Sequence, residues 1–293
     1  MIKIKRREKR RFKDGHVTRS GLNKSVTYFF VAILCAFMLL PGVYVIGNSL
    51  KPVDELFKFP PTIVPQNPTI QNFRLMLNLL SETNMSFFRY FFNTVFITAV
   101  VAAAQIIMAS MTAYSLSKIP YPGSNAIFQV IVYSMMINSS VASVPTFIIF
   151  SKLGIIDTYW GMIVPGLVST MGFYLMKQFM ETNVPNELLE AGRIDGAAEL
   201  SIFFKIVMPL LKPAWYTLII LSIQNLWGRT SSNAYREVFK TLPEALSQIS
   251  TGGLERTGVA GACAVVMMAV PLICFIVMQS NMLDTMSSSG LKG

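Results

Sequence analysis

The sequence predicts an all-α integral membrane protein with six transmembrane helices and a cytoplasmic helix-turn-helix coupling loop. Hydrophobic residues make up 53% of the 293 residues and charged residues only 14%, whereas soluble domains carry roughly 25% charged residues. The charged residues leave six long uncharged stretches between them, the shortest of which, 213–228, has 16 residues. Ten of the 25 Lys and Arg residues precede Ser25. A nucleic-acid-binding domain would spread its basic residues over a folded surface, so we expect no nucleic-acid partner.

The uncharged stretches cover 25–50, 90–117, 119–151, 158–176, 213–228 and 257–283. A helix rises about 1.5 Å per residue, so crossing about 30 Å of hydrocarbon takes about 20 residues. Five stretches are long enough, and 213–228 can span if Lys212 and Arg229 extend to opposite interfaces. The sequence therefore predicts three parts: a basic tail over 1–25, a six-helix transmembrane domain over 26–283 and a C-terminal tail over 284–293.

Six spans put both termini on the same side of the membrane. If the N-terminus is inside, the inner segments 1–25, 118–125, 177–212 and 284–293 hold 16 basic residues, and the outer segments 51–89, 152–157 and 229–256 hold nine. Because basic residues gather on the cytoplasmic side of membrane proteins, we expect both termini in the cytoplasm.

The inner segment over 177–212 is the longest inner loop. Its residues predict two short helices joined by a turn, with Pro185 at a first helical position, Asp195 capping the second helix and Gly196 at the bend. Apolar residues such as Leu189 form one side of the segment. Such a loop either docks on a partner protein or lies on the membrane surface as an amphipathic segment, and the residues alone leave both readings open.

The loop resembles the EAA motif, E-A-A-x3-G-x9-I-x-L-P, found in the membrane subunits of ATP-binding-cassette (ABC) importers. The spacing fits throughout, with Gly192 for the third residue of the motif and Met208 for its Leu. In relatives this segment couples the membrane subunit to an ATPase subunit. The resemblance implies the same role here for Glu190, Ala191, Gly192, Asp195, Gly196, Ala197, Ile206 and Pro209.

The resemblance extends along nearly the whole chain and is similar to the MalG-like branch of carbohydrate permeases. Ser49-Leu50-Lys51-Pro52, Asn93-Thr94 and Leu242-Pro243 fit that branch. The departures are Asn138, where the family often has Pro, and Thr285 and Ser289, which replace glycines of the terminal tail.

This resemblance implies a multi-pass subunit of a sugar or oligosaccharide importer in a bacterial cell membrane. Its implied partners are a second permease subunit in a heterodimer, two ATPase subunits or domains and an extracellular solute-binding protein. The chain has no G-x4-G-K-[ST] phosphate loop, so we expect no enzyme activity and no bound cofactor in this chain, with ATP and Mg on the partner subunits.

Polar residues within the spans are candidates for the substrate pathway, because such groups are costly at membrane depth unless they are functional or packed. Amide and hydroxyl groups with an aromatic platform suit a sugar. The opposing interpretation is that these groups hold helices together. The candidates are Gln105 in the second stretch, Asn138 and Ser139 in the third, and Asn225 and Trp227 in the fifth.

Two other classes of protein remain as alternatives. A self-contained secondary transporter or channel would carry ionisable residues within its spans, and the six stretches contain no Asp, Glu, Lys or Arg. An intramembrane enzyme would need a nucleophile with a base at membrane depth. The single histidine, His16, lies in the basic tail, and the three cysteines are not spaced like metal ligands, so we expect no metal site.

Overall fold

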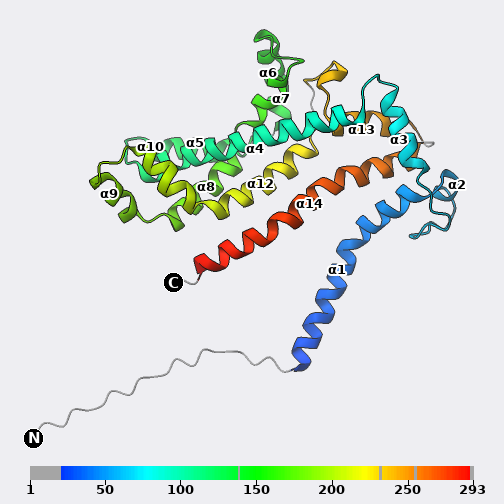
Figure 1. The fold of residues 1–293 in the computed structure, drawn as a ribbon, viewed down its shortest axis with the longest axis horizontal. Coiled ribbons are helices and arrows are strands. Elements are labelled where there is room, and N and C mark those ends of the chain that lie inside the picture. Colours follow the sequence, from blue (N-terminus) through cyan, green and yellow to red (C-terminus); the bar gives the residue numbers. More distant parts are fainter. Residues whose placement is uncertain (1–20, 138, 231–232, 254–255, 291–293) are drawn as a thin grey trace, which may run out of the picture. The chain divides into compact units, whose positions relative to one another are not determined.

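The computed structural model describes residues 21–137, 139–230, 233–253 and 256–290. Every regular element in these ranges is helical, in agreement with the predicted all-α class (Figure 1). The chain divides at Tyr44 into two compact units, 1–44 and 45–293. Each unit is described by itself.

The described part of the first unit is helix α1 (Gly21–Leu50) as far as Tyr44. Its large apolar side chains are exposed, with Phe37 at 70% and Met38 at 75% of their full exposure. A helix with such a surface needs lipid or another apolar surface around it.

The second unit is organised around helix α4 (Phe87–Lys118), which has 32 residues. Helices α8 (Thr170–Asn183) and α12 (Lys212–Trp227) pack against α4, and α12 also packs against α14 (Thr257–Gly290). Apolar side chains from α4, α8 and α12 form the largest buried cluster of the unit. This cluster fixes α4 relative to the two helices that carry most of the site described below.

Short helices gather at the two ends of α4 (Figure 1). Helices α9 (Asn186–Ile194) and α10 (Glu199–Ile202) lie at one end, called here the α9 end. Helices α3 (Gln71–Ser81) and α13 (Leu242–Ser250) lie at the other, called the α13 end. The remaining described elements are α2 (Val53–Leu56), α5 (Ser124–Ser134), α6 (Ser139–Lys152), α7 (Tyr159–Ile163), the 3-10 helix η1 (Val164–Gly166), the π-helical turn η2 (Phe203–Val207), α11 (Met208–Leu210) and the 3-10 helix η3 (Glu237–Phe239).

Hydrogen bonds tie α4 to the neighbouring segment at its α13 end. The side-chain amide of Asn93 donates to the carbonyl oxygens of Val238, at 2.8 Å, and Lys240, at 3.0 Å. The amide N–H of Leu242 donates to the Thr94 hydroxyl at 2.8 Å. Since Asn93 and Thr94 are both buried, these bonds satisfy polar groups that would otherwise destabilise the fold.

Three helices of the described chain are long and apolar enough to cross a membrane: Ser25–Leu50 within α1, α4, and Thr257–Gln279 within α14. A further crossing is available if Glu199–Leu210 and α12, which meet at 77°, act as one bent span. Multiple apolar helices agree with a multi-pass membrane protein. The count of six spans stays a prediction.

Two of the predicted spans are interrupted rather than continuous. The stretch 119–151 contains α5 and α6 as separate helices, and the stretch 158–176 breaks between η1 and α8. Pro165 lies within η1. Because proline has no backbone N–H, it cannot donate the hydrogen bond that a regular helix would need at this position. Ser169 then starts α8 by accepting a hydrogen bond from the Gly172 amide at 3.0 Å. The absence of charge therefore identified apolar segments but not the breaks within them.

Candidate functional site: the α9–α10 loop and a polar pocket beside α12

Helix α9 ends in a tight turn that requires a glycine. Gly196 has a φ of 76°, a conformation that costs other residues roughly 1–2 kcal/mol. The Gly196 amide donates to the Arg193 carbonyl at 3.1 Å, and the Ala197 amide donates to the Gly192 carbonyl at 3.0 Å. These two bonds are the pair that terminates many helices at a glycine. The turn between α9 and α10 is thus set by the local sequence.

The prediction that Asp195 caps the second helix is wrong. Asp195 is the last half-helical residue of α9, and α10 begins at Glu199 after an extended Ala198 with a ψ of 147°. The reason is the positive φ of Gly196, which reverses the chain directly after Asp195. Pro185 likewise precedes α9 instead of forming its first residue.

The predicted coupling residues divide into an exposed group and an internal group. The internal group packs between the two arms of the loop: a Cβ atom on Gly192 would lie 3.3 Å from side-chain atoms of both Ile202 and Ile206. Next to the exposed group, Ile194 is 85% and Leu200 63% exposed. The exposed residues are Glu190, Ala191, Asp195, Gly196 and Pro209, and the buried or half-buried ones are Gly192, Ala197 and Ile206.

A tyrosine on α4 connects this helix to the α9–α10 loop. The Tyr114 hydroxyl donates to Oε2 of Glu199 at 2.6 Å. The other carboxylate oxygen of Glu199 accepts from Nε of Arg193 at 2.7 Å. The Tyr114 ring is buried and lies 5.4 Å, centroid to centroid, from the ring of Phe203. One carboxylate thus joins α4, α9 and α10.

A lysine makes a second connection at the same end of α4. Nζ of Lys118 donates to the Val184 carbonyl at 2.6 Å and to the side-chain oxygen of Asn186 at 2.9 Å. Glu190 and Arg193 line a cavity of 360 Å³ between α9 and this end of α4. Glu190 is thus an exposed carboxylate that lines an open cavity of this chain.

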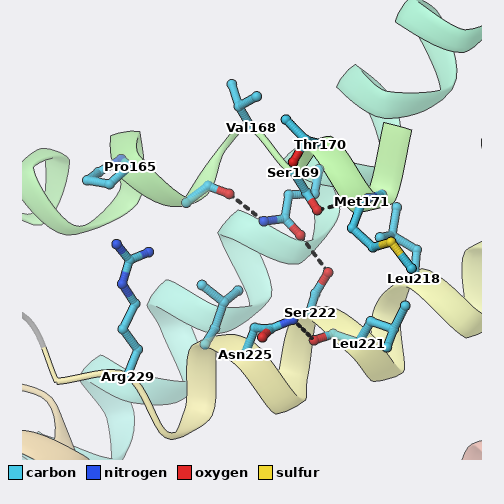
Figure 2. A pocket seen from close by; sticks show the side chains of 14 residues that line it. Pro165, Val168, Ser169, Thr170, Met171, Leu218, Leu221, Ser222, Asn225 and Arg229 are labelled. Atoms are coloured by element: carbon cyan, nitrogen blue, oxygen red, sulfur yellow. Dashed lines mark hydrogen bonds between the residues drawn. The ribbon is translucent and has the colours of Figure 1, made fainter. Parts of the chain in front are cut away.

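A pocket of 420 Å³ lies between α12 and the chain that leads from η1 into α8. It is called here the polar pocket because its wall combines apolar residues with six polar side chains, those of Gln105, Ser169, Thr170, Ser222, Asn225 and Arg229. Figure 2 shows Ser169, Thr170, Ser222 and Asn225 around it, with Arg229 extending from the end of α12 toward the segment at Pro165. None of the residues that line this pocket is acidic.

Gln105 is the central buried group behind this pocket. Its side-chain amide donates to the Gly166 carbonyl at 2.5 Å, and its side-chain oxygen accepts from the Ser222 hydroxyl at 2.5 Å. Gln105 is 7% exposed and Ser222 only 3%. Both polar ends of Gln105 are occupied within the chain, so it holds α4, η1 and α12 together at the pocket wall.

The predicted pathway residues do not form one group. Gln105 and Asn225 both line the polar pocket. Trp227 instead lines a separate, mainly apolar pocket of 360 Å³ with residues of α4 and α14. Its indole N–H donates to the Met267 carbonyl at 2.9 Å, and the side chain is 3% exposed. Asn138 lies outside the described residues, and the side chain of Ser139 is not among those described.

Asp157 is a carboxylate that organises the neighbouring chain and that no sequence-based prediction singled out. Asp157 accepts from the backbone amides of Tyr235, at 2.9 Å, and Arg236, at 2.8 Å, and from the Arg236 guanidinium at 2.7 Å. These donors, the Arg236 amide above all, hold the pKa of Asp157 below its ordinary value. No sequence pattern marks this pairing, because the partners are 79 positions apart.

The fold and these features define a class: an all-helical, multi-pass membrane protein with a short-helix loop at one end of its central helix and a polar pocket between its helices. The chain matches the family described as "Binding-protein-dependent transport system inner membrane component" over residues 105–285. It belongs to this family of membrane subunits of ABC transport systems. The resemblance drawn from the EAA spacing is confirmed at the level of the family.

Two curated relatives are similar over most of the chain. The arabinooligosaccharides transport system permease protein AraQ of Halalkalibacterium halodurans is 28% identical over 278 residues, which cover 92% of this chain and 95% of AraQ. The polygalacturonan/rhamnogalacturonan transport system permease protein YtcP of Bacillus subtilis is 28% identical over 72% of this chain and 71% of its own.

A solved structure supports the fold. A crystal structure of a bacterial ABC transporter involved in the import of the acidic polysaccharide alginate contains a chain with a TM-score of 0.74 to this one. The two are 22% identical, and the match covers 89% of this chain and 98% of the other. The likeness shows a shared fold.

Proposed function

We propose that this chain is the transmembrane subunit of an ATP-driven importer for a sugar or oligosaccharide delivered by an external binding protein. The observation that carries the proposal is the α9–α10 loop, whose residues match the EAA spacing and which Glu199 connects to Tyr114 of α4. The carbohydrate class rests on the names of the relatives, which assign AraQ to arabinooligosaccharide transport and YtcP to polygalacturonan/rhamnogalacturonan transport. Alginate is the solute of the transporter with the similar fold.

The loop is suited to receive a protein partner. Ile194 and Leu200 expose large apolar side chains beside the turn at Gly196, and exposed apolar groups of this size gain free energy when another surface covers them. In this proposal, an ATPase subunit covers them and Glu190 forms a polar contact in its cleft. ATP and Mg belong to that subunit, and this chain contributes no catalytic group.

The assembly proposed is a second permease subunit, two ATPase subunits or domains, an extracellular binding protein and this chain. The orientation proposed has six spans, with both termini and the α9 end in the cytoplasm, and its main support is the ten basic residues of the N-terminal tail. The α13 end then faces outward, toward the binding protein.

Co-purification and transport together test this proposal. The complete importer should hydrolyse ATP faster when its binding protein is loaded with sugar, and cells that lack this chain should lose uptake of the same sugar. The alternative, a self-contained transporter or channel, predicts uptake that continues when the ATPase subunits carry an inactivated ATP site. Such uptake would contradict the proposed function.

A cross-linking variant tests the docking surface directly. Ala191→Cys, in the exposed group of the loop, should form a disulfide with a cysteine engineered in the ATPase cleft. Asn125→Cys, exposed near the start of α5 in the expected inner segment 118–125, is the matched control and should form none. Equal cross-linking of both would show that the contact is not specific to the loop.

A further inference from the structure

We propose that the polar pocket beside α12 selects saccharides that carry a carboxylate, and that Arg229 binds this carboxylate. The inference rests on the proposed function and narrows its substrate class. The pocket, at 420 Å³, falls within the range of about 300–1,000 Å³ typical of small-molecule sites.

The charge of the pocket comes from a single residue. Arg229 lines it, and no acidic residue does. Within the described part of the chain, the Arg229 side chain has neither a hydrogen bond nor an ion pair. The four ion pairs in this part of the chain all involve other cations: Lys177, Arg193, Arg236 and Lys240. An unpaired guanidinium at a pocket without acids creates a positive potential that favours an anionic ligand.

The hydrogen-bonding groups of the pocket point to the same ligand. Two of its acceptors are already used: the Gln105 oxygen accepts from Ser222, and the Leu221 carbonyl accepts from the Asn225 amide at 2.9 Å. The donors of Arg229 remain available, and so does the hydroxyl hydrogen of Ser169, whose oxygen accepts from the Gly172 amide. A pocket with spare donors suits a ligand rich in acceptors, and a carboxylate presents two oxygens to a guanidinium fork.

The sugar ring would contact the rest of the wall. The side-chain oxygen of Asn225 is left to accept from a ring hydroxyl, since its amide nitrogen is used within α12. Figure 2 shows Asn225 and Arg229 on the same side of the pocket, at the end of α12. One residue can therefore hold a hydroxyl while the other holds the acid group.

Two simpler roles for Arg229 need separation from this one. A cation at the C-terminal end of α12 stabilises the helix dipole, and a long basic side chain at the end of a span reaches the interface. A lysine performs both roles equally well, but it lacks the planar fork that binds a carboxylate through two parallel hydrogen bonds. Arg229→Lys therefore distinguishes ligand binding from support of the helix.

The test uses the complete importer with its binding protein in intact cells. The probes are labelled digalacturonate and its carboxyl-reduced form, which differs only in the acid groups. Arg229→Gln should raise the uptake KM for digalacturonate about tenfold or more, as expected for a lost charged hydrogen bond, and leave uptake of the neutral sugar unchanged. Arg229→Lys should recover only part of the loss. Lys152→Gln, an exposed cation of α6 that does not line the pocket, should change neither.

Each other result overturns the inference. If Arg229→Gln lowers uptake of both sugars alike or prevents co-purification of the other subunits, Arg229 supports the assembly rather than the ligand. Full recovery of digalacturonate uptake by Arg229→Lys would mean that Arg229 acts only as a cation at the end of α12. If the wild-type importer takes up the neutral sugar and not digalacturonate, the inference fails and the proposed function stands. If the wild type takes up neither of these nor any sugar of a wider panel, both fail.

Discussion

The Tyr114 hydroxyl and the Glu199 carboxylate meet at 2.6 Å although 85 positions separate them in the sequence. Tyr114 belongs to the central helix α4, and Glu199 is the first residue of α10. Because Glu199 also pairs with Arg193 of α9, this contact fixes both arms of the loop to the helix that runs through the second unit.

Tyr114→Phe should weaken the coupling between ATP hydrolysis and transport. The substitution keeps the ring against Phe203 and removes a hydrogen bond to a charged group, which contributes about 1.5–3 kcal/mol. We expect less sugar imported for each ATP hydrolysed, measured in proteoliposomes. Tyr133→Phe removes a hydroxyl from an exposed tyrosine of α5 and should leave the ratio unchanged. An unchanged ratio in Tyr114→Phe as well would mean that this contact does not transmit force.

Substitutions of Gly196 should separate backbone strain from steric blockage. A Cβ atom at this position would meet nothing within 4 Å in the chain itself, so Gly196→Ala suffers only the cost of its positive φ, about 1–2 kcal/mol. Gly196→Asn should be milder, since Asn tolerates this conformation. Gly196→Trp should abolish uptake and co-purification of the ATPase subunit while the protein still inserts in the membrane. Normal uptake by Gly196→Trp would return the loop to the membrane-surface interpretation.

Cysteine labelling should report the orientation of the chain. Single cysteines at Gln66 and Thr251, both exposed, should react with an impermeant maleimide on intact cells. A cysteine at Glu187, exposed on α9, should react only after permeabilisation. Labelling of Glu187→Cys from outside would contradict both the orientation and the proposed docking of the loop.

Trp227 and Asn225 should respond differently to substitution. Trp227 is packed against Phe91, with ring centroids 6.0 Å apart, so Trp227→Ala should destabilise the protein by about 3–5 kcal/mol. Asn225 is exposed in the isolated chain, so Asn225→Leu should lower uptake without lowering the melting temperature of the purified complex. Equal melting temperatures for Trp227→Ala and wild type would contradict its assignment to the core.

Glu244 should make stability depend on pH. Burial raises the pKa of this α13 carboxyl to about 7. The pKa of a glutamate in an unfolded chain is about 4.3. Between that pH and about pH 7, the folded chain binds more protons than the unfolded chain, so the free energy of unfolding should fall as pH rises through this window. Above it, the dependence on Glu244 should end. The melting temperature between pH 5 and 8 measures this effect.

Glu244→Gln removes the ionisable group and should flatten that part of the profile, with a higher melting temperature at pH 7.5. Glu82→Gln changes an exposed carboxyl at the end of α3 and serves as the control. A pH profile that Glu244→Gln leaves unchanged would mean that another group controls it.

The sequence could predict what composition and short spacings encode. The lengths of the uncharged stretches 90–117 and 257–283 predicted α4 and α14. The EAA spacing predicted the loop in which Gly196 terminates α9. The capping preference of Asp195 gave a wrong prediction because of its neighbour. The positive φ of Gly196 reverses the chain directly after Asp195, so Asp195 lies at the end of α9 instead of at the start of α10.

Pairings between distant residues had no signal in the sequence. Tyr114 with Glu199, Gln105 with Ser222 and Asp157 with Arg236 each join segments separated by 79 to 117 positions. Such pairs arise because helices that are far apart along the chain pack together, and one sequence carries no record of which helices do so. The same limit applies to Trp227, for which the sequence left both a pathway role and a packing role open, because it does not show which face of α12 is covered by α14.

Helix α4 contains neither glycine nor proline along its 32 residues, whereas α1, α6 and α14 each contain a proline. At about 1.5 Å per residue it extends about 48 Å, further than the hydrocarbon layer is thick. Because α4 has no proline or glycine at which it could kink, we expect it to move as one rigid helix. In the proposed assembly, a displacement of the α9–α10 loop would tilt α4 through Tyr114 and Lys118 and would move Asn93 and Thr94 the opposite way. The proposal therefore predicts that movement of the loop reaches the α13 end as a rocking motion of one helix.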